Sequence, residues 1–320
     1  MKGLFYIDGK DALSKYGIFI TEGGYNGVVS FPAIKAPEQS NDWAEHDGVE
    51  VDLSDPKLDT KEVEIKFAAT GKYFTGDFIS LLSDKVYHTF NFVEIGYTCK
   101  LRLATEVNIQ LLIEAKTFTL KFSDDFPMNG YTYLKPSSNM VPIQGYELDG
   151  VDFSVYGIRV LEGSEAQIQK CPTVKKNMLR NISTQNGVIY DGEKVVYQQK
   201  EVALNCCLIA KNFTEFWRNY NAFLYDLIRV VEVDEDGIKV QTAERSLFLE
   251  KIYEEYPCYY KNGKVSLLDP NGNIWCKFTL TLVFTSFRVG GDEYLLASEN
   301  GELIVTEDGK FYIDLKDYAS

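Results

Sequence analysis

Two short acidic motifs are the residues of this chain whose types and spacing could bind a metal. Asp8 and Asp11 form an Asp-Gly-x-Asp sequence, and Asp149 and Asp152 form it a second time. Carboxylate oxygens are the ligands that Ca²⁺ prefers, so calcium is one interpretation. The other is a tight turn followed by a helix cap, because Asp side chains accept hydrogen bonds from nearby backbone amides. We favour the turn and cap, and predict no metal.

A further acidic stretch imitates the start of an EF-hand loop. Asp269, Asn271 and Asn273 have the right spacing. However, Gly272 stands at the fourth position where the motif needs it at the sixth, and Leu280 stands where the bidentate Glu belongs. The motif therefore fails.

Histidine and cysteine chemistry is equally sparse. His46 and His88 are the only histidines that could activate a Ser or Cys nucleophile, and the matching positions of the second half are not His. Carboxylate pairs for glycoside hydrolysis exist among 47 acidic residues, but nothing selects one pair. No P-loop or G-x-G-x-x-G sequence follows a strand. We predict no catalytic residue and no cofactor.

The six cysteines contain no C-x-x-C pair, so no zinc site is indicated. Most lie in apolar, strand-like segments, which favours buried reduced thiols over disulfides. They are Cys99, Cys171, Cys206, Cys207, Cys258 and Cys276.

Composition narrows the class of protein. The 320 residues are 45% hydrophobic and 14% aromatic, with 21 Tyr and 20 Phe, which favours strands. A net charge of −14 without a basic stripe argues against nucleic acid as a partner. The sequence shows no signal-peptide pattern and no apolar run of bilayer length, so we expect no membrane association.

The elements that must carry these motifs occur twice. Tyr16-Gly17-Ile18 matches Tyr156-Gly157-Ile158 at an offset of about 140 residues, the length of one domain. Lys200-Glu201-Val202 likewise repeats Lys61-Glu62-Val63. The repeated positions that define the duplication are Asp8, Gly9, Tyr16, Gly17, Asp149, Gly150, Tyr156 and Gly157.

Periodicity predicts the elements of each copy. Residues 16–20 read as a strand, and residues 61–67 alternate apolar and charged residues, as expected for a half-exposed antiparallel strand. Helical spacing follows Thr75 in the first copy, and covers 213–228 in the second, where Asn212 and Glu215 have the spacing of a capping box.

We therefore predict a mainly β (α+β) protein with two tandem, similar sheet or split-barrel domains, each with one amphipathic helix. The first covers residues 1–130 and the second 146–290, joined by a linker at 131–145 whose Pro and Ser residues break all periodicity. Residues 291–320 repeat short strands and turns, and predict a C-terminal hairpin that must dock elsewhere to be stable.

The dense tyrosine cluster from Tyr253 to Tyr260 could line a sugar-binding surface, but packing in a core or at a subunit interface is the favoured interpretation. For the helix at 213–228 we expect packing against its own sheet. The interface candidates are Trp43, Trp217, Tyr253, Tyr256, Tyr259 and Tyr260.

The order of these motifs resembles the N-terminal domain of distal tail proteins of long-tailed bacteriophages. The shared pattern is an apolar strand, Asp-Gly-x-Asp, Tyr-Gly-Ile, Pro-x-Ile/Val-Lys, an Asp-Gly or Asn-Gly turn, Lys-Glu-Val and an amphipathic helix. It occurs once per copy and covers most of the chain. The terminal Ser-Glu-Asn-Gly and Thr-Glu-Asp-Gly repeats are similar to tails of prophage structural proteins from Bacteroides-like hosts.

The resemblance implies a non-enzymatic component of the virion tail, assembled in the host cytoplasm, that forms a ring and joins the tube to other tail and baseplate proteins. Family members usually follow this domain with an unrelated β-sandwich, whereas here the domain recurs. Three chains, as in baseplate hub proteins, or six would then close a ring. The acidic balance would suit a lumen that repels DNA. Alternatives are a carbohydrate-binding or adhesin module and a glycoside hydrolase.

Overall fold

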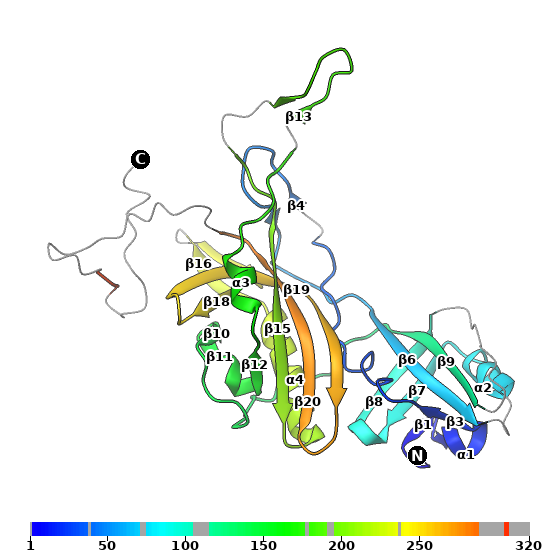
Figure 1. Ribbon diagram of the computed structural model, residues 1–320. Coiled ribbons are helices and arrows are strands. Elements are labelled where there is room, and N and C mark those ends of the chain that lie inside the picture. Colours follow the sequence, from blue (N-terminus) through cyan, green and yellow to red (C-terminus); the bar gives the residue numbers. More distant parts are fainter. Residues whose placement is uncertain are drawn as a thin grey trace.

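The computed structural model describes residues 2–37, 40–70, 75–104, 115–176, 179–190, 195–235, 238–287 and 304–306. Within these ranges the chain is mainly β and contains two curled seven-stranded antiparallel sheets that lie side by side (Figure 1). The predicted fold class of two tandem, similar sheet domains is confirmed. The predicted hairpin at 291–320 lies outside the described residues, apart from 304–306.

The first sheet has the order β2-β1-β7-β8-β9-β6-β3. Its strands are β1 (Phe5–Ile7), β2 (Lys10–Asp11), β3 (Ile18–Ile20), β6 (Lys61–Thr70), β7 (Tyr87–Phe92), β8 (Tyr97–Leu103) and β9 (Ala115–Asp124).

The second sheet has the order β11-β10-β18-β19-β20-β15-β12. Its strands are β10 (Tyr146–Leu148), β11 (Val151–Asp152), β12 (Ile158–Val160), β15 (Lys200–Ala210), β18 (Arg245–Leu249), β19 (Glu254–Asp269) and β20 (Ile274–Phe284).

The two orders are the same when each strand is replaced by its counterpart one repeat later. The matching central strands also share a burial pattern: β6 and β15 both alternate buried and exposed residues and then become continuously buried. This alternation places Val63, Ile65 and Phe67 inside, as predicted. A hairpin of β16 (Val231–Glu235) and β17 (Ile238–Thr242) interrupts the second copy before β18.

The helices repeat as well. α2 (Thr75–Leu82) and α4 (Phe213–Ile228) each follow the long central strand, and α4 buries Phe216, Phe223 and Leu227 in the core. Asn212 caps α4 by accepting a 2.9 Å hydrogen bond from the Glu215 amide, as the sequence predicted. The remaining helices are short: α1 (Ala12–Tyr16), η1 (Val93–Ile95), η2 (Phe153–Tyr156) and α3 (Ser164–Gln169).

One strand prediction was wrong at its start. Tyr16 belongs to the helix α1, and Gly17 ends this helix with a left-handed φ of 67° before β3 begins at Ile18. Tyr156 and Gly157 repeat this arrangement at the end of η2, with φ of 71°. The Tyr-Gly-Ile motif is therefore a helix stop, for which glycine is favoured because it lacks a Cβ.

Each copy also extends a hairpin arm away from its sheet. The first arm, residues 40–51, contains β4 (Ser40–Asn41) and β5 (Glu50–Val51), and the second arm, residues 179–190, contains β13 (Leu179–Arg180) and β14 (Ile189–Tyr190). Both arms point to the same side of the molecule (Figure 1). Residues 131–145, the predicted linker, contain no helix or strand.

Candidate functional site: the contact between the repeats

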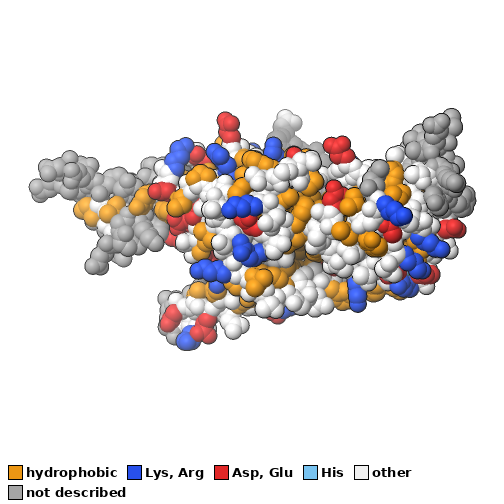
Figure 2. All heavy atoms as spheres, turned by 90° about the horizontal axis from the view of Figure 1, so that it is seen from below, with side chains coloured by type: hydrophobic (Ala, Val, Ile, Leu, Met, Phe, Trp, Pro, Cys, Tyr) orange, Lys and Arg blue, Asp and Glu red, His pale blue; other side chains and the backbone are white. Residues whose placement is uncertain are grey.

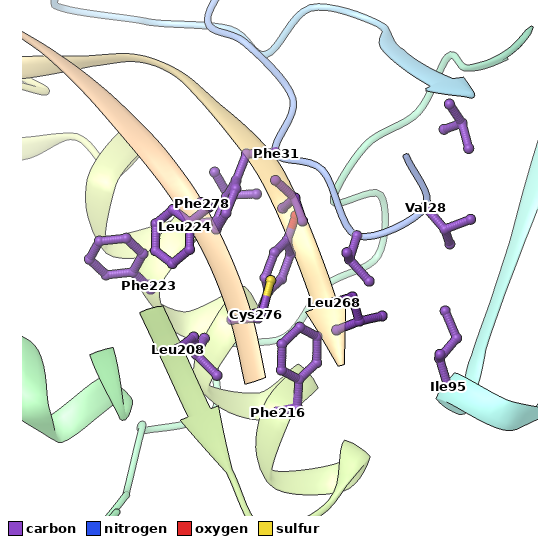
Figure 3. Close-up of a cluster of buried hydrophobic side chains, with 14 of the residues drawn as sticks. Val28, Phe31, Ile95, Leu208, Phe216, Phe223, Leu224, Leu268, Cys276 and Phe278 are labelled. Carbon is purple, nitrogen blue, oxygen red and sulfur yellow. The ribbon is translucent and has the colours of Figure 1, made fainter. Parts of the chain in front are cut away.

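A segment of the first repeat crosses onto the second sheet. This strap, residues 26–35, follows β3 and carries Phe31 into the second core, where its ring lies 4.5 Å from Tyr220 and 4.9 Å from Phe278. Figure 3 shows Phe31 together with Phe278 and Leu224 of the second repeat. Buried side chains of both sheets therefore belong to one continuous core.

A glycine of the second repeat provides the space for Phe31. A Cβ atom at Gly263 would lie 2.8 Å from the Phe31 ring, closer than side chains tolerate. Gly263 lies in β19 between two irregularities of its pairing with β20, at Tyr260/Asn262 and Val265/Leu267. The strap and β19 thus fit each other at the level of single atoms.

Polar contacts hold the strap at intervals along β19. The Tyr260 hydroxyl donates to the Pro32 carbonyl at 2.6 Å, and the Ile34 amide donates to the Lys261 carbonyl at 2.9 Å. At its other end, Asn26 exchanges two hydrogen bonds of 3.1 Å with the backbone of Ser266 and Leu268. These bonds satisfy backbone groups that the strap would otherwise bury unpaired.

The first arm binds the base of the second arm, where Lys175 lies just before the arm begins. Nζ of Lys175 lies 2.6 Å from a carboxylate oxygen of Asp42, and donates to the carbonyls of Trp43 at 2.8 Å and Gly48 at 2.7 Å. The Lys175 side chain is only 3% exposed. This arrangement, here called the lysine clasp, satisfies all three donors of the buried ammonium group.

Backbone pairing and an apolar cluster reinforce the clasp. The Gly48 amide donates to the Tyr197 carbonyl, and a carboxylate oxygen of Asp47 accepts from the Tyr197 amide at 2.8 Å. Beyond the first arm, Leu53 is buried against Ala243, Tyr259 and Val283 of the second repeat. The strap and first arm therefore contact the second repeat along much of its sheet.

The helix α4 closes the other side of the same contact. The Trp217 indole stacks on Tyr97 of the first sheet with ring centres 4.4 Å apart, and its N–H donates to the Ile95 carbonyl at 2.6 Å. Trp217, which the sequence marked as an interface candidate, thus contacts the neighbouring repeat of its own chain.

The other aromatic candidates do not form one surface. Tyr259 and Tyr260 are buried beneath the first arm and the strap, and Tyr256 stacks on Phe284 with ring centres 4.9 Å apart. Tyr253 occupies a turn with φ of 55° and packs edge-on against Phe248. Trp43 is 51% exposed at the tip of the first arm, and its carbonyl belongs to the lysine clasp.

The Asp-Gly-x-Asp motifs are turns, as favoured from the sequence. Asp8 and Gly9 have φ of 49° and 77°, and Asp149 and Gly150 have φ of 50° and 76°, the values of a two-residue hairpin turn. The later acid caps the next helix in both copies, with Asp11 accepting from Ser14 and Asp152 from Ser154. The described residues contain no group of three or more potential metal ligands.

The first acid of each motif contacts a buried basic side chain. Asp8 lies 2.8 Å from Nδ1 of His88 and accepts from the Thr89 amide at 3.0 Å. Burial raises the pKa of Asp8, but bonds from the Thr89 amide, His88 and Lys85 outweigh it and lower this pKa to about 2. Asp149 contacts buried Arg245 at 2.7 Å at the matching point. His88 is thus a structural group at a turn, and His46 is exposed in the first arm.

A cavity of about 520 Å³ lies between the first sheet, residues 126–131 and α4. Lys61 lines it, and burial lowers the pKa of this lysine to about 8. Its Nζ donates to the Val28 carbonyl at 2.5 Å. Lys200, the matching residue, is also buried, with its ammonium 5.1 Å from the Phe284 ring centre. Because both copies bury this lysine, its recurrence favours a role in the fold over a catalytic one.

All six cysteines are free, and four of them are buried, which confirms the reduced thiols expected from the sequence. Burial raises the pKa of Cys99 to about 12. Cys171, which precedes Pro172 as Phe31 precedes Pro32, is exposed. The buried cysteines are Cys206, Cys207, Cys258 and Cys276.

Comparisons with protein-family models, with curated proteins and with solved structures found no match to this chain. No helix in the described ranges is long and apolar enough to cross a membrane. On the face shown in Figure 2, acidic and basic side chains are interspersed with hydrophobic ones.

Sequence reasoning missed this contact. The repeated Pro-x-Ile/Val-Lys pattern places Pro32, Ile34 and Lys35 over Pro172, Val174 and Lys175, but it predicts no contact for these residues. The available signal was the difference between the copies, Phe31 against Cys171. A large apolar residue retained in one copy and replaced in the other marks a site whose surroundings differ.

Proposed function

We propose that this chain is a structural, non-enzymatic component of a phage or prophage tail, and that its copies join head to tail in a ring at the tail tip or baseplate. The observation that carries this proposal is the contact between the repeats. Two units of the same topology are joined through unlike surfaces, since the strap and arm of one lie on the sheet and arm base of the next.

Two units joined through unlike surfaces still leave one copy of each surface free. Each added unit offers the same free surface again, so such units form a closed ring or an open filament. Two units per chain make a ring of three chains pseudo-sixfold, which matches the symmetry expected of a tail tube. The resemblance of the motif order to distal tail proteins supports the same assignment, with other tail and baseplate proteins as partners and the virion tail as the location.

Mass photometry combined with negative-stain electron microscopy of the purified chain tests this proposal. We expect closed rings of three or six chains, whose population rises with protein concentration. A chain that stays monomeric at every concentration, or that forms only twofold dimers, would contradict it.

A further inference from the structure

The parts of the lysine clasp occur a second time in the same chain, and there no described residue joins them. Both arm bases carry the same backbone pairing: the Lys35 amide donates to Lys57 at 2.8 Å, and the Lys175 amide donates to Val196 at 2.7 Å. Isolated bridges repeat the match, joining Ile34 to Leu58 and Val174 to Tyr197. Lys35 is thus the structural counterpart of Lys175. However, Lys175 is buried, whereas Lys35 is exposed and its ammonium has no partner among the described residues.

The two arm tips match as closely as the two bases. Eight residues, 42–49, join the strands of the first arm, and eight residues, 181–188, join those of the second. Both tips contain the same turn, closed by the His46 amide on the Trp43 carbonyl and by the Gln185 amide on the Ile182 carbonyl. Gly48 and Gly187 both have a left-handed φ, 69° and 81°.

The tip of the second arm therefore has counterparts of the three groups with which the first arm binds Lys175. Asn181, Ile182 and Gly187 occupy the positions of Asp42, Trp43 and Gly48. Asn181 replaces a carboxylate by an amide oxygen, which still accepts a hydrogen bond but carries no charge. All residues from 179 to 190 are exposed, including the apolar Ile182, Val188 and Ile189.

We propose that the second arm of one chain grips the base of the first arm in a second copy of this chain, with Lys35 of that copy in the cradle formed by Asn181, Ile182 and Gly187. The partner is a second copy of this chain because the donor that fits the cradle is a lysine at an arm base of this same fold. Asn186 then accepts from the Leu58 amide of the neighbour, as Asp47 accepts from Tyr197. This docking rests on the proposed function and specifies the surfaces that join the ring.

Sedimentation velocity of three variants over a concentration series tests the docking. Lys35→Glu places a negative charge against the carbonyl cradle, and should weaken association by about tenfold or more. Asn181→Asp restores the carboxylate of the first arm, and should tighten association about threefold or more. Lys10→Glu, a charge reversal at another exposed lysine, on β2, is the matched control and should associate like the wild type.

The outcomes separate the docking from the proposed function. Association that Lys35→Glu leaves unchanged, in rings that still form, would overturn the docking site and leave the ring standing. A wild-type chain that remains monomeric would overturn both. Asn181→Asp gives an independent test, because it should tighten association, which a misfolded variant would not do. If Asn181→Asp does not tighten association, this would also contradict the docking.

Discussion

The two arms are built alike but differ in their surroundings. The first arm lies against the second repeat, where Gly48 is buried and the Lys175 ammonium has all three partners. The second arm has the same strands, loop length and glycine, yet every described residue from 179 to 190 is exposed. Among the described residues nothing covers the second arm, and the docking proposed above would account for this difference between the arms.

The same contrast applies to the strap and to the matching segment around Cys171. Phe31 fills a pocket between α4 and β20, while its counterpart Cys171 is exposed. The contact within the chain is therefore a stronger version of the contact proposed between chains. The contact within the chain buries an aromatic ring as well as the arm. The contact proposed between chains uses the arm without such a ring.

The largest difference in stability between matching variants of the two repeats should come from positions 31 and 171. Phe31→Ala removes a buried ring from the joint and should lower the free energy of unfolding by about 3–5 kcal/mol. Cys171→Ala, its exposed counterpart, should change it by less than about 0.5 kcal/mol. Chemical denaturation followed by tryptophan fluorescence measures both, and equal effects would show that Phe31 does not support the joint.

Replacing the buried lysine of the first repeat should stabilise the protein. With a pKa of about 8 in the fold against about 10.4 when unfolded, Lys61 carries a penalty of about 3 kcal/mol while it is charged. Lys61→Met should therefore unfold at higher denaturant concentration below pH 8. Between pH 8 and 10 the unfolded chain binds more protons, so the wild type should gain stability relative to the variant.

Lys200→Met provides the matched comparison for the second repeat. Burial also lowers the pKa of Lys200, but this lysine lies beside aromatic rings that favour its charge. We expect a smaller gain from this variant. A difference between wild type and Lys61→Met that stays constant from pH 7 to about 10 would contradict the role assigned to burial.

The two Asp-Gly turns should differ in how much their first aspartate stabilises the protein against chemical denaturation. Asp149→Asn leaves the buried guanidinium of Arg245 without its carboxylate, and should lower the free energy of unfolding by about 2–3 kcal/mol.

Asp8→Asn should lower the free energy of unfolding by about 1 kcal/mol, because Asp8 is partly screened by solvent. Since the pKa of Asp8 is about 2 in the fold and higher when unfolded, this contribution is present above pH 4 and lost as the pH falls toward 2. Denaturation midpoints of both variants at pH 7 and pH 2 measure these differences, and an effect of Asp8→Asn that is as large at pH 2 as at pH 7 would contradict the ion pairing.

The clasp itself should have a smaller effect on the stability of the monomer than the Phe31 joint. Lys175→Ala removes three hydrogen bonds of an ammonium group, but leaves Asp42 solvated, so we expect a loss of about 2 kcal/mol. Lys35→Ala should leave the stability of dilute, monomeric protein within about 0.5 kcal/mol. Hydrogen exchange of the Gly48 and Tyr197 amides should accelerate only in Lys175→Ala. Equal acceleration in both variants would show that the two lysines are not distinguished by their surroundings.

Much of the fold follows from local sequence. The Asp-Gly turns, the alternation from Lys61 to Phe67 and the capped helix after Asn212 depend on residues close to one another in the chain, so periodicity and turn chemistry predicted them. The strand start at Tyr16 was wrong because a single turn of helix, ended by Gly17, is too short to show a period.

The contact between the repeats could not be read in the same way. Lys175 and Asp42 lie 133 residues apart in the chain, and nothing local distinguishes Lys175 from Lys35. Their difference depends on which neighbour the fold places beside each of them. Similarly, nothing near Gly263 in the chain indicates that this glycine leaves room for Phe31, because the two residues belong to different repeats.

A cryo-electron microscopy reconstruction of the assembled chain tests the central claim most directly. It should show each second arm on the first repeat of the next chain, with Lys35 surrounded by Asn181, Ile182 and Gly187, in the arrangement that Lys175 has within the chain. A ring in which the second arm projects into solvent, or in which Lys35 stays exposed, would contradict the account.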